Sequence, residues 1–316
     1  MKVVRINAFG GPEQLVLTEV LPAVAHPGQV VVKVEASGVG LVDSLVRRGM
    51  YPGLRQADLV PGGEVAGQVI SLGDGVDEAW LGQRVYALIR MGGYAQEVAV
   101  ATTDLIPLPD SITAVQAVGL GINALVATLA LHRANLQPGQ HLLVRGAGGG
   151  IGVMAVQLAL QAGAVVTAVT SSEVRRTQLQ AYGPINVLDR SEAVARTEYY
   201  DGIIDPVAGP ETTLFLNKLR PNGHYVLIGM AAGLPPMDWG MSLLQIYSQS
   251  PSVSFLSLDS YPTHVLEEAL TDAFTLVMQN KLKAVVQQTY ALAEAAEAHR
   301  QLDLGEVFGK LVLTNQ

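Results

Sequence analysis

Residues 141–170 read HLLVRGAGGGIGVMAVQLALQAGAVVTAVT, and this stretch decides the fold of the chain. A short apolar run at 141–144 meets a glycine cluster at 146–152, and a helical pattern then continues to about Gly163. A second apolar run, rich in β-branched residues, follows at 165–170. This order predicts a strand, a glycine-rich turn, a helix and a second strand.

The glycine cluster has the spacing of a dinucleotide-binding turn. Ala147, Gly149 and Gly152 occupy the three key positions of a G-x-G-x-x-G variant. Glycines permit a tight turn and let backbone N–H groups approach a pyrophosphate at the start of the helix. Glycine-rich turns also occur for purely structural reasons, but the strand–turn–helix context favours dinucleotide binding.

Composition narrows the functional classes. The 316 residues suffice for two domains, and the formal net charge of −8 argues against non-specific binding to nucleic acid or to an anionic membrane. Cysteine is absent, which removes disulfides, thiolate nucleophiles and cysteine-ligated zinc. Apolar stretches at 114–131 and 151–170 carry amides and glycines, so we expect buried elements rather than membrane spans. The N-terminus does not read as a signal peptide, and we expect a cytoplasmic protein.

The pattern of elements divides the chain into two parts. Residues 1–117 show short strands between Gly and Pro turns, with one short helix at about 41–48, and predict a β-rich, barrel-like domain. Helices and strands alternate over 118–258, which predicts a doubly wound parallel sheet with right-handed crossovers. The crossover between 189 and 201 is short, so we expect a helix of a turn or two there. Residues 259–316 end in a short strand, and we expect them to pack on the first domain.

Specific helices and strands are predicted within the second part and just before it. A helix is predicted at 112–132, and another at 211–219 before a strand at 224–229. The run at 253–258 is predicted to be the last strand, at the edge of the sheet. Because an exposed apolar edge is usually paired, we expect a homodimer through this strand.

The residues after the second strand indicate which nicotinamide cofactor is used. NAD enzymes usually place Asp or Glu at this point to accept from the ribose 2′-OH, whereas here the strand ends near Ser171. Arg175 and Arg176 follow, and Arg190 comes just after the third strand. Hydroxyls and guanidinium groups suit a 2′-phosphate, so the pattern predicts NADPH, although Glu173 is an acidic neighbour. The alternative is that paired arginines are solvated charges on a helix surface.

Several short motifs carry a family resemblance. They are Phe9-Gly10-Gly11-Pro12-Glu13, Gly38-Val39 followed by Asp43, Arg48-Gly49-Met50-Tyr51-Pro52, Pro61-Gly62-Gly63-Glu64-Val65-Ala66-Gly67, Gly92-Gly93-Tyr94-Ala95, Leu136-Gln137-Pro138-Gly139-Gln140, Val156-Gln157-Leu158-Ala159, Asp205-Pro206-Val207-Ala208-Gly209 and Gly309-Lys310. With the glycine cluster, they cover nearly the whole chain. The chain resembles the zinc-free branch of the medium-chain dehydrogenase/reductase superfamily, the zeta-crystallin-like quinone oxidoreductases.

The resemblance implies a GroES-like catalytic domain at 1–117, completed by 259–316, and a Rossmann NADPH-binding domain at 118–258. It also implies a homodimer. Cofactor contacts are implied at aligned positions: the N–H groups of Gly149, Gly150 and Ile151, the strand ends at Val207 and Gly229, and Phe308 and Lys310 in the tail. Asn123 replaces a threonine that similar proteins use near the nicotinamide, and its amide can still bond the carboxamide.

The resemblance also outlines the substrate site. Gly40 and Gly63 stand where zinc-dependent relatives have two ligands, and no cysteine is present for a third, so we expect no metal. Gly40, Tyr51, Arg90 and Met91 are expected to line the substrate pocket. The Tyr51 hydroxyl is a candidate proton donor, and the alternative is an ordinary loop tyrosine that packs on the domain wall.

Two acidic residues in the first part of the chain are expected to have structural roles. Asp43 is interpreted as a structural acid in the first turn of a helix, and Glu64 as a buried hydrogen-bond acceptor.

The resemblance implies an NADPH-dependent reductase of quinones or α,β-unsaturated carbonyls, with small-molecule substrates. Two alternatives stay open: an enoyl reductase for thioester-linked or carrier-bound substrates, and a non-catalytic, crystallin-like NADPH-binding protein.

Overall fold

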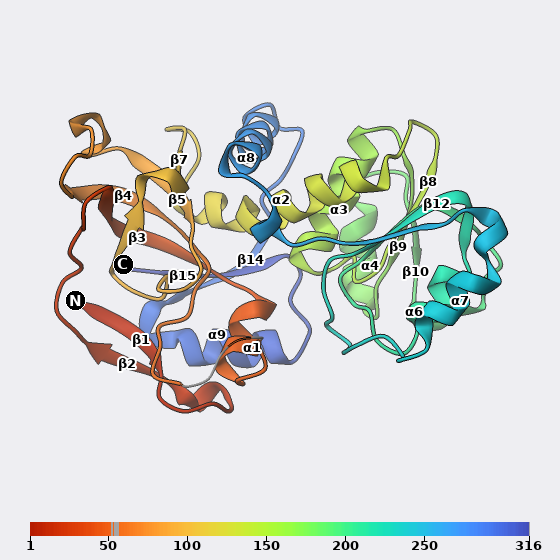
Figure 1. Cartoon of the computed structure of the whole chain (residues 1–316), viewed down its shortest axis with the longest axis horizontal. Helices are drawn as coiled ribbons and strands as arrows, with labels where there is room; N and C mark the ends of the chain where they lie inside the picture. Colours follow the sequence, from red (N-terminus) through yellow and green to blue (C-terminus); the bar gives the residue numbers. More distant parts are fainter. Residues whose placement is uncertain (52, 54–56, 316) are drawn as a thin grey trace. The chain divides into compact units, whose positions relative to one another are not determined.

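The computed structural model describes residues 1–51, 53 and 57–315 of the chain (Figure 1). Contacts divide the chain into two compact units. The first unit joins Met1–Ile122 with Thr271–Gln316, and the second unit is Asn123–Leu270. The two units meet at 122/123 and 270/271, and the domain boundaries expected at 117/118 and 258/259 stay predictions.

The first unit is built on a seven-stranded sheet. Its main path has the order β14-β15-β3-β4-β5-β7, formed by β14 (Val286–Ala291), β15 (Lys310–Thr314), β3 (Gln29–Val39), β4 (Glu64–Leu72), β5 (Arg84–Leu88) and β7 (Leu105–Pro107). Strand β6 (Glu97–Ala101) also pairs with β3, while β1 (Lys2–Ile6) and β2 (Leu15–Glu19) form a separate antiparallel pair. The C-terminal strand β15 lies antiparallel to β3, so strands from the N-terminal and C-terminal parts of the sequence share one sheet (Figure 1).

A run of β-branched apolar residues explains why β3 forms. Val30, Val32 and Val34 are buried and pack against a cluster that includes Val65 and Val85. Val31 between them is buried as well, so this part of β3 is covered on both faces. The β-rich first domain is therefore confirmed. Two short helices, α1 (Leu41–Arg47) and α9 (Ala295–Asp303), accompany this sheet.

The long helix α2 (Ala114–Ala134) contains a break that the sequence pattern did not reveal. Gly121 has φ 14° and ψ −120°, which is outside the helical region. The N–H of Ile122 donates to Glu64 Oε2 at 3.0 Å, and a Cβ on Gly121 would lie 2.0 Å from that oxygen. The predicted helix at 112–132 is thus present but kinked, because a buried carboxylate takes a backbone N–H in its middle.

Length and apolar composition alone would let α2 cross a membrane. In the structure 72% of its most apolar 18-residue window is buried inside the protein. An all-round apolar helix of this kind is typical of the core of a large protein.

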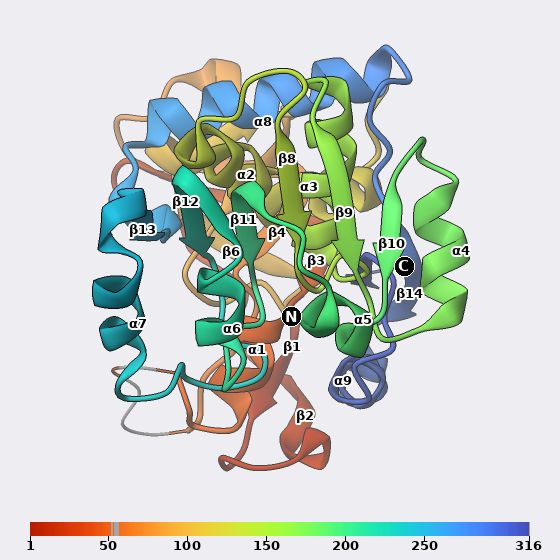
Figure 2. The same ribbon diagram turned by 90° about the vertical axis from the view of Figure 1, so that its right-hand side faces the viewer.

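The second unit is a six-stranded parallel sheet in the order β10-β9-β8-β11-β12-β13. Its strands are β8 (His141–Val144), β9 (Val165–Val169), β10 (Asn186–Leu188), β11 (Tyr200–Asp205), β12 (Leu219–Leu227) and β13 (Ser252–Phe255). Its helices are α3 (Gly150–Gln161), α4 (Glu173–Gln180), α5 (Arg190–Ala195), α6 (Thr212–Leu216), α7 (Trp239–Gln245) and the first half of α8 (Thr263–Met278). Figure 2 shows the strands side by side, with α4 beyond β10. This order confirms the doubly wound sheet, and it reverses between β8 and β11.

Most predicted elements of the second unit are found, with one error of length. The helix predicted at 211–219 is only α6, Thr212–Leu216, and β12 begins at Leu219 rather than at residue 224. Tyr200 pairs with Leu219, and the register then shifts before the next pair. The Pro-Asn-Gly sequence after Arg220 therefore lies at an irregularity within β12, between the predicted helix and the predicted strand. The last strand is confirmed at the sheet edge, ending at Phe255.

Candidate functional site

The glycine loop connects β8 to the first turn of α3. Gly149 is the N-cap residue of α3, and its own N–H donates to the carbonyl of Gly146 at 3.0 Å. The N–H of Ala147 donates to Val169 in β9 at 3.0 Å. The N–H groups of Gly150 and Ile151 lie in the first helical turn, where no preceding carbonyl is available within the helix. They are therefore the better candidates for a pyrophosphate, while the N–H of Gly149 is engaged in the turn.

Three glycines leave room that a side chain would fill. A Cβ on Gly152 would lie 2.4 Å from the carbonyl oxygen of Gly146, so this glycine lets the helix pack on the turn. A Cβ on Gly150 would lie 2.5 Å from the side-chain nitrogen of Asn123, which places that predicted residue beside the loop. Above Gly149 the nearest atom to a Cβ would be 3.4 Å away. The loop is thus an uncovered cradle whose helix dipole favours an anion.

A buried hydroxyl lies at the end of the neighbouring strand. Thr170 follows β9 and is only 6% exposed, yet its Oγ1 has no hydrogen-bond partner among the residues that the structure describes. Buried polar groups are almost always paired, so an orphaned hydroxyl at this edge of the sheet fits a polar ligand. The predicted Ser171 is exposed next to it, and Ser172 caps α4. The donor set and the space both fit the phosphates and ribose of a dinucleotide.

The three predicted arginines lie in different surroundings. A Cβ on Gly148 would lie 2.5 Å from Cδ of Arg175, so the Arg175 side chain lies against Gly148 of the glycine loop. Arg176 instead pairs with Glu192 at 2.9 Å and with Glu173 at 3.2 Å. Arg190 pairs with another carboxylate, that of Glu211, at 2.7 Å. Of the three, only Arg175 is shown against the glycine loop.

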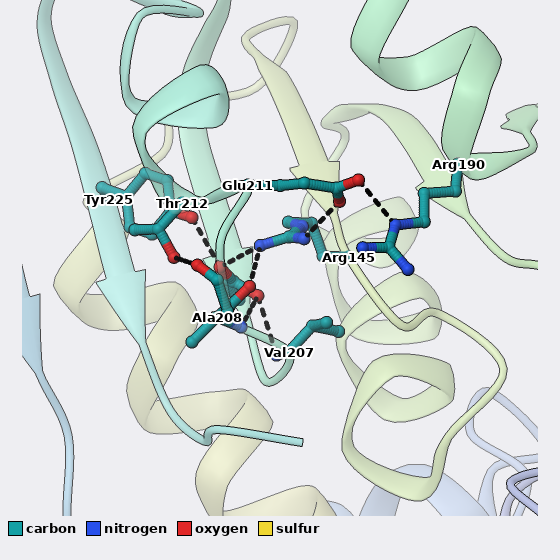
Figure 3. Close-up of polar contacts among 9 residues, drawn as sticks. Arg145, Arg190, Val207, Ala208, Glu211, Thr212 and Tyr225 are labelled. Carbon is teal, nitrogen blue, oxygen red and sulfur yellow. Dashed lines mark hydrogen bonds and ion pairs between the residues drawn. The ribbon is translucent and has the colours of Figure 1, made fainter. Parts of the chain in front are cut away.

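The loop after β11 adjoins the glycine loop (Figure 3). The N–H of Val207 donates to Asp205 Oδ1 at 2.7 Å, and a Cβ on Gly146 would lie 2.9 Å from Cγ2 of Val207. Gly229 approaches the same loop, because its Cβ would lie 2.8 Å from the carbonyl oxygen of Pro206. The predicted positions Val207 and Gly229 therefore lie at one edge of the sheet, beside the cradle.

Sequence reasoning missed Arg145, which comes directly after β8 and is only 3% exposed. Its guanidinium forms an ion pair with Asp205 at 2.7 Å (Figure 3). A charged residue between an apolar strand and a glycine turn was the available signal, because charge at the end of a buried strand needs a partner. The partner itself could not be read from the sequence, since 60 positions separate the two.

The first unit contains a second set of buried polar groups, centred on Glu64 in β4. Glu64 is 1% exposed and accepts from the Tyr86 hydroxyl at 2.9 Å and from the N–H of Ile122 at 3.0 Å. Its other oxygen pairs with Lys310 Nζ at 2.5 Å. Glu64 is confirmed as a buried hydrogen-bond acceptor. Burial and the nearby Glu64 charge raise the pKa of Tyr86 well above its usual value.

Asp43 holds two backbone segments in place. Its carboxylate accepts from the N–H of Gly40 at 2.8 Å and from the N–H of Gly62 at 3.1 Å. Burial raises the pKa of Asp43 to about 6, against the opposing effects of the Gly40 amide and of Lys310. The interpretation of Asp43 as a structural acid at the start of α1 agrees with these contacts.

Next to Asp43 lies a chain of buried side chains. The Tyr94 hydroxyl is 2.9 Å from Nε2 of His299, and Nδ1 of His299 is 3.3 Å from the Arg47 guanidinium. Because Arg47 can only donate, Nδ1 accepts and Nε2 carries the proton. Burial, reinforced by Arg47, lowers the pKa of His299 to about 3, and burial raises that of Tyr94 well above its usual value. His299 is therefore neutral at physiological pH.

The predicted substrate-pocket residues differ in their contacts and in their exposure. A Cβ on Gly40 would lie 3.6 Å from Lys310 Nζ, so this glycine lies beside the polar cluster. Tyr51 and Met91 are half-buried and pack against the same apolar cluster of the first unit, while Arg90 is exposed. The packing of Tyr51 fits the domain-wall interpretation, and its role as a proton donor stays a prediction. Pro52, which follows it in the motif, lies outside the described residues.

The remaining predicted cofactor contacts are in the tail of the first unit. Phe308 is 8% exposed, and its N–H donates to the Gln287 side chain at 2.6 Å. Lys310 is 5% exposed and is held by Glu64. Within the part of the chain that the structure describes, no three His, Asp or Glu side chains are grouped as metal ligands would be.

Comparison with known proteins identifies the family. The alcohol dehydrogenase GroES-like domain model matches residues 26–110, and the zinc-binding dehydrogenase model matches residues 184–313. The quinone oxidoreductase of Rattus norvegicus is 29% identical over 328 residues, covering 99% of this chain and 97% of that protein. A probable oxidoreductase from Mycobacterium abscessus is 30% identical, with a TM-score of 0.84 and coverage of 99% of this chain and 98% of that one. The Escherichia coli quinone oxidoreductase complexed with NADPH has a TM-score of 0.92 at 25% identity, over 99% of this chain and 100% of that one.

The fold, the glycine cradle and these likenesses define an oxidoreductase of the medium-chain dehydrogenase/reductase superfamily. Within it, the chain belongs to the zinc-free, quinone oxidoreductase-like family. The resemblance drawn from the short motifs is thereby confirmed.

Proposed function

We propose that the chain is an NADPH-dependent reductase of quinones or α,β-unsaturated carbonyls. The observation that carries the proposal is the uncovered cradle, formed by the first-turn N–H groups of α3 beside the orphaned Thr170 hydroxyl. The quinone oxidoreductase names of relatives and the NADPH in the E. coli structure support the same proposal.

The cofactor would be held from both sides of the glycine loop. The N–H groups of Gly150 and Ile151 would bind the diphosphate, and Asn123 lies beside the same turn. Hydroxyls at Thr170 and Ser171, with the Arg175 guanidinium, suit a 2′-phosphate, because no Asp or Glu ends β9. When bound, the reduced nicotinamide supplies the hydride.

The acceptor would be activated without a metal. The chain lacks cysteine, and Gly40 and Gly63 have no side chain that could bind a metal ion. A quinone or an enone spreads the developing negative charge by conjugation, so a weak acid or water suffices as proton donor. Tyr51 is the proposed weak acid. Treatment with a chelator is therefore expected to leave the rate unchanged.

We also propose a homodimer through the outer edge of β13. This strand ends the sheet, and Phe255 on it is 54% exposed. An edge strand whose outer side is not occupied by another strand of the sheet favours pairing with a second copy.

The experiment is a panel of quinones, enones and enoyl thioesters, each assayed with NADPH and NADH at the nicotinamide absorbance. Oxidation of NADPH by quinones or enones is the expected result. Turnover of enoyl thioesters alone would replace the proposal by an enoyl reductase. Tight NADPH binding without oxidation by any acceptor would indicate a non-catalytic binding protein, and higher catalytic efficiency with NADH would contradict the cofactor assignment.

A further inference from the structure

Arg145 is buried between three separate segments of the second unit. Its guanidinium bonds Asp205 at 2.7 Å, the Ala208 carbonyl at 3.0 Å and Glu211 at 3.1 Å. It also lies 4.1 Å from the ring centre of Phe215. Figure 3 shows Ala208 and Glu211 beside the Arg145 guanidinium. Because both terminal nitrogens of the guanidinium already donate to oxygen atoms of the protein, Arg145 acts on its neighbours rather than on a ligand.

Those neighbours lie in and on both sides of the loop after β11, which has an unfavourable backbone conformation. Ala208 has φ +51° and Gly209 has φ +75°, so two successive residues are left-handed. Alanine rarely adopts this conformation unless its surroundings impose it. Here Asp205 accepts from the N–H of Ala208 at 2.9 Å, while Arg145 takes the Ala208 carbonyl. The ion pair thus holds both polar groups of the strained residue.

The strained loop adjoins the cradle at the switch point of the sheet. Arg145 is followed directly by Gly146, whose Cβ position is 2.9 Å from Cγ2 of Val207. The order of the strands reverses between β8 and β11, and ligands of such sheets bind outside the carboxyl ends at this point. One buried side chain therefore ties together the two loops that border the cofactor position.

We propose that Arg145 is a positioning residue that preorganises the loops after β8 and β11 for the dinucleotide. The inference rests on the proposed NADPH-binding function. Lysine is a poor substitute, because a single ammonium group cannot reach two carboxylates and a carbonyl in fixed directions. Without the arginine, the loop conformation that binds the dinucleotide should be less populated. The dissociation constant should then rise by the factor by which that population falls.

The test compares R145K and R145M with R47K in the first unit. Arg47 is a matched control, since it is 0% exposed and bonds Asp303 at 2.7 Å, far in sequence from both loops. Two readouts are used: the NADPH dissociation constant from calorimetry, and hydrogen exchange of the Val207 and Ala208 amides without cofactor. If R145M lowers the population of the loop conformation that binds NADPH to about a tenth, the dissociation constant and the exchange rates should both rise by about tenfold. R145K should raise both by less. R47K should change neither.

Equal NADPH affinity and equal exchange in R145K and wild type would overturn the inference, as would the same losses in R47K. Should R145M fail to fold, R145K alone decides the question. A wild-type protein that binds no NADPH would refute the proposed function. The exchange rates, measured without cofactor, would still show whether Arg145 holds the loop.

Discussion

At the residue scale, the arginines predicted to bind a 2′-phosphate are not equivalent. The Arg175 side chain lies against Gly148 in the glycine loop, while Arg176 and Arg190 pair with Glu192 and Glu211. A guanidinium beside the expected phosphate position can form charged hydrogen bonds to the phosphate, so we expect Arg175 to contribute most. The sequence identified the group of arginines but could not rank its members, because Glu192 and Glu211 meet them only in the fold.

Replacing Arg175 should therefore change cofactor preference. R175A is expected to raise the KM for NADPH by about tenfold or more and to leave that for NADH nearly unchanged, since a charged hydrogen bond to phosphate is lost only with NADPH. R176A and R190A are the matched controls and should have smaller effects. Equal losses for NADPH and NADH in R175A would contradict this assignment.

Buried Asp43 and His299 should make stability depend on pH in opposite directions. The pKa of Asp43 rises from 3.8 to about 6 on folding, so the folded state binds the proton more tightly between these values. The free energy of unfolding then falls as pH rises from 3.8 to 6, by about 3 kcal/mol for this group. The pKa of His299 falls from 6.5 to about 3, so its contribution is fully present above pH 6.5 and is lost as pH falls toward 3.

Urea unfolding of wild type, D43N and H299Q at several pH values tests both signs. The stability of wild type relative to D43N should decrease as pH rises from 4 to 6. The stability of wild type relative to H299Q should increase with pH over the same interval. Parallel profiles for all three proteins would show that neither group titrates as the structure indicates.

At the element scale, the kink in α2 shows what periodicity cannot detect. Gly121 stands in a largely apolar stretch, and the sequence predicts one continuous helix there. The break depends on Glu64, which lies 58 positions from the Ile122 N–H that it accepts. Strand β14 was missed for a related reason, because Gln287, Gln288 and Thr289 lack the alternating apolar pattern and the strand forms only by pairing with β15.

Alanine at Gly121 should be strongly destabilising. A Cβ there would lie 2.0 Å from the Glu64 carboxylate, and displacing a buried charge from its partners costs about 3 kcal/mol or more. G240A in α7 is the matched control, since a Cβ on Gly240 meets nothing within 4 Å and should be neutral or stabilising by about 0.5–1 kcal/mol. Urea unfolding of both variants is the measurement. A G121A protein as stable as wild type would show that the helix tolerates the side chain.

The elements that the sequence predicted well are those with a strong local pattern. β8 has the predicted limits, and the short α5 lies in the crossover expected to hold a turn or two of helix. The glycine loop was also placed correctly, because its glycines are local requirements of a tight turn. Arg145 and the polar cluster of Glu64 were not found as networks, since their partners come from distant strands.

At the scale of the whole molecule, the proposed dimer concerns the open edge of β13. The N–H of Leu256 donates to Leu227 in β12, and successive N–H groups of a strand point to opposite sides. The N–H of Val253 therefore points to the outer edge. Proline is tolerated where a strand N–H faces an open edge.

V253P should prevent edge pairing without removing a hydrogen bond to β12. We expect wild type to sediment as a dimer and V253P as a folded monomer at micromolar concentration in analytical ultracentrifugation. S254P is the control that removes an inward hydrogen bond, and it should lower the free energy of unfolding instead. A wild-type protein that sediments as a monomer would rule out this dimer.

The central claim is that the cradle between β8 and α3 binds the phosphates of a nicotinamide dinucleotide. A crystal structure of the protein grown with NADPH tests it most directly. The account predicts diphosphate oxygens on the N–H groups of Gly150 and Ile151, with the 2′-phosphate beside Ser171 and Arg175. NADPH bound elsewhere, or a cradle without the dinucleotide at saturating concentration, would contradict it.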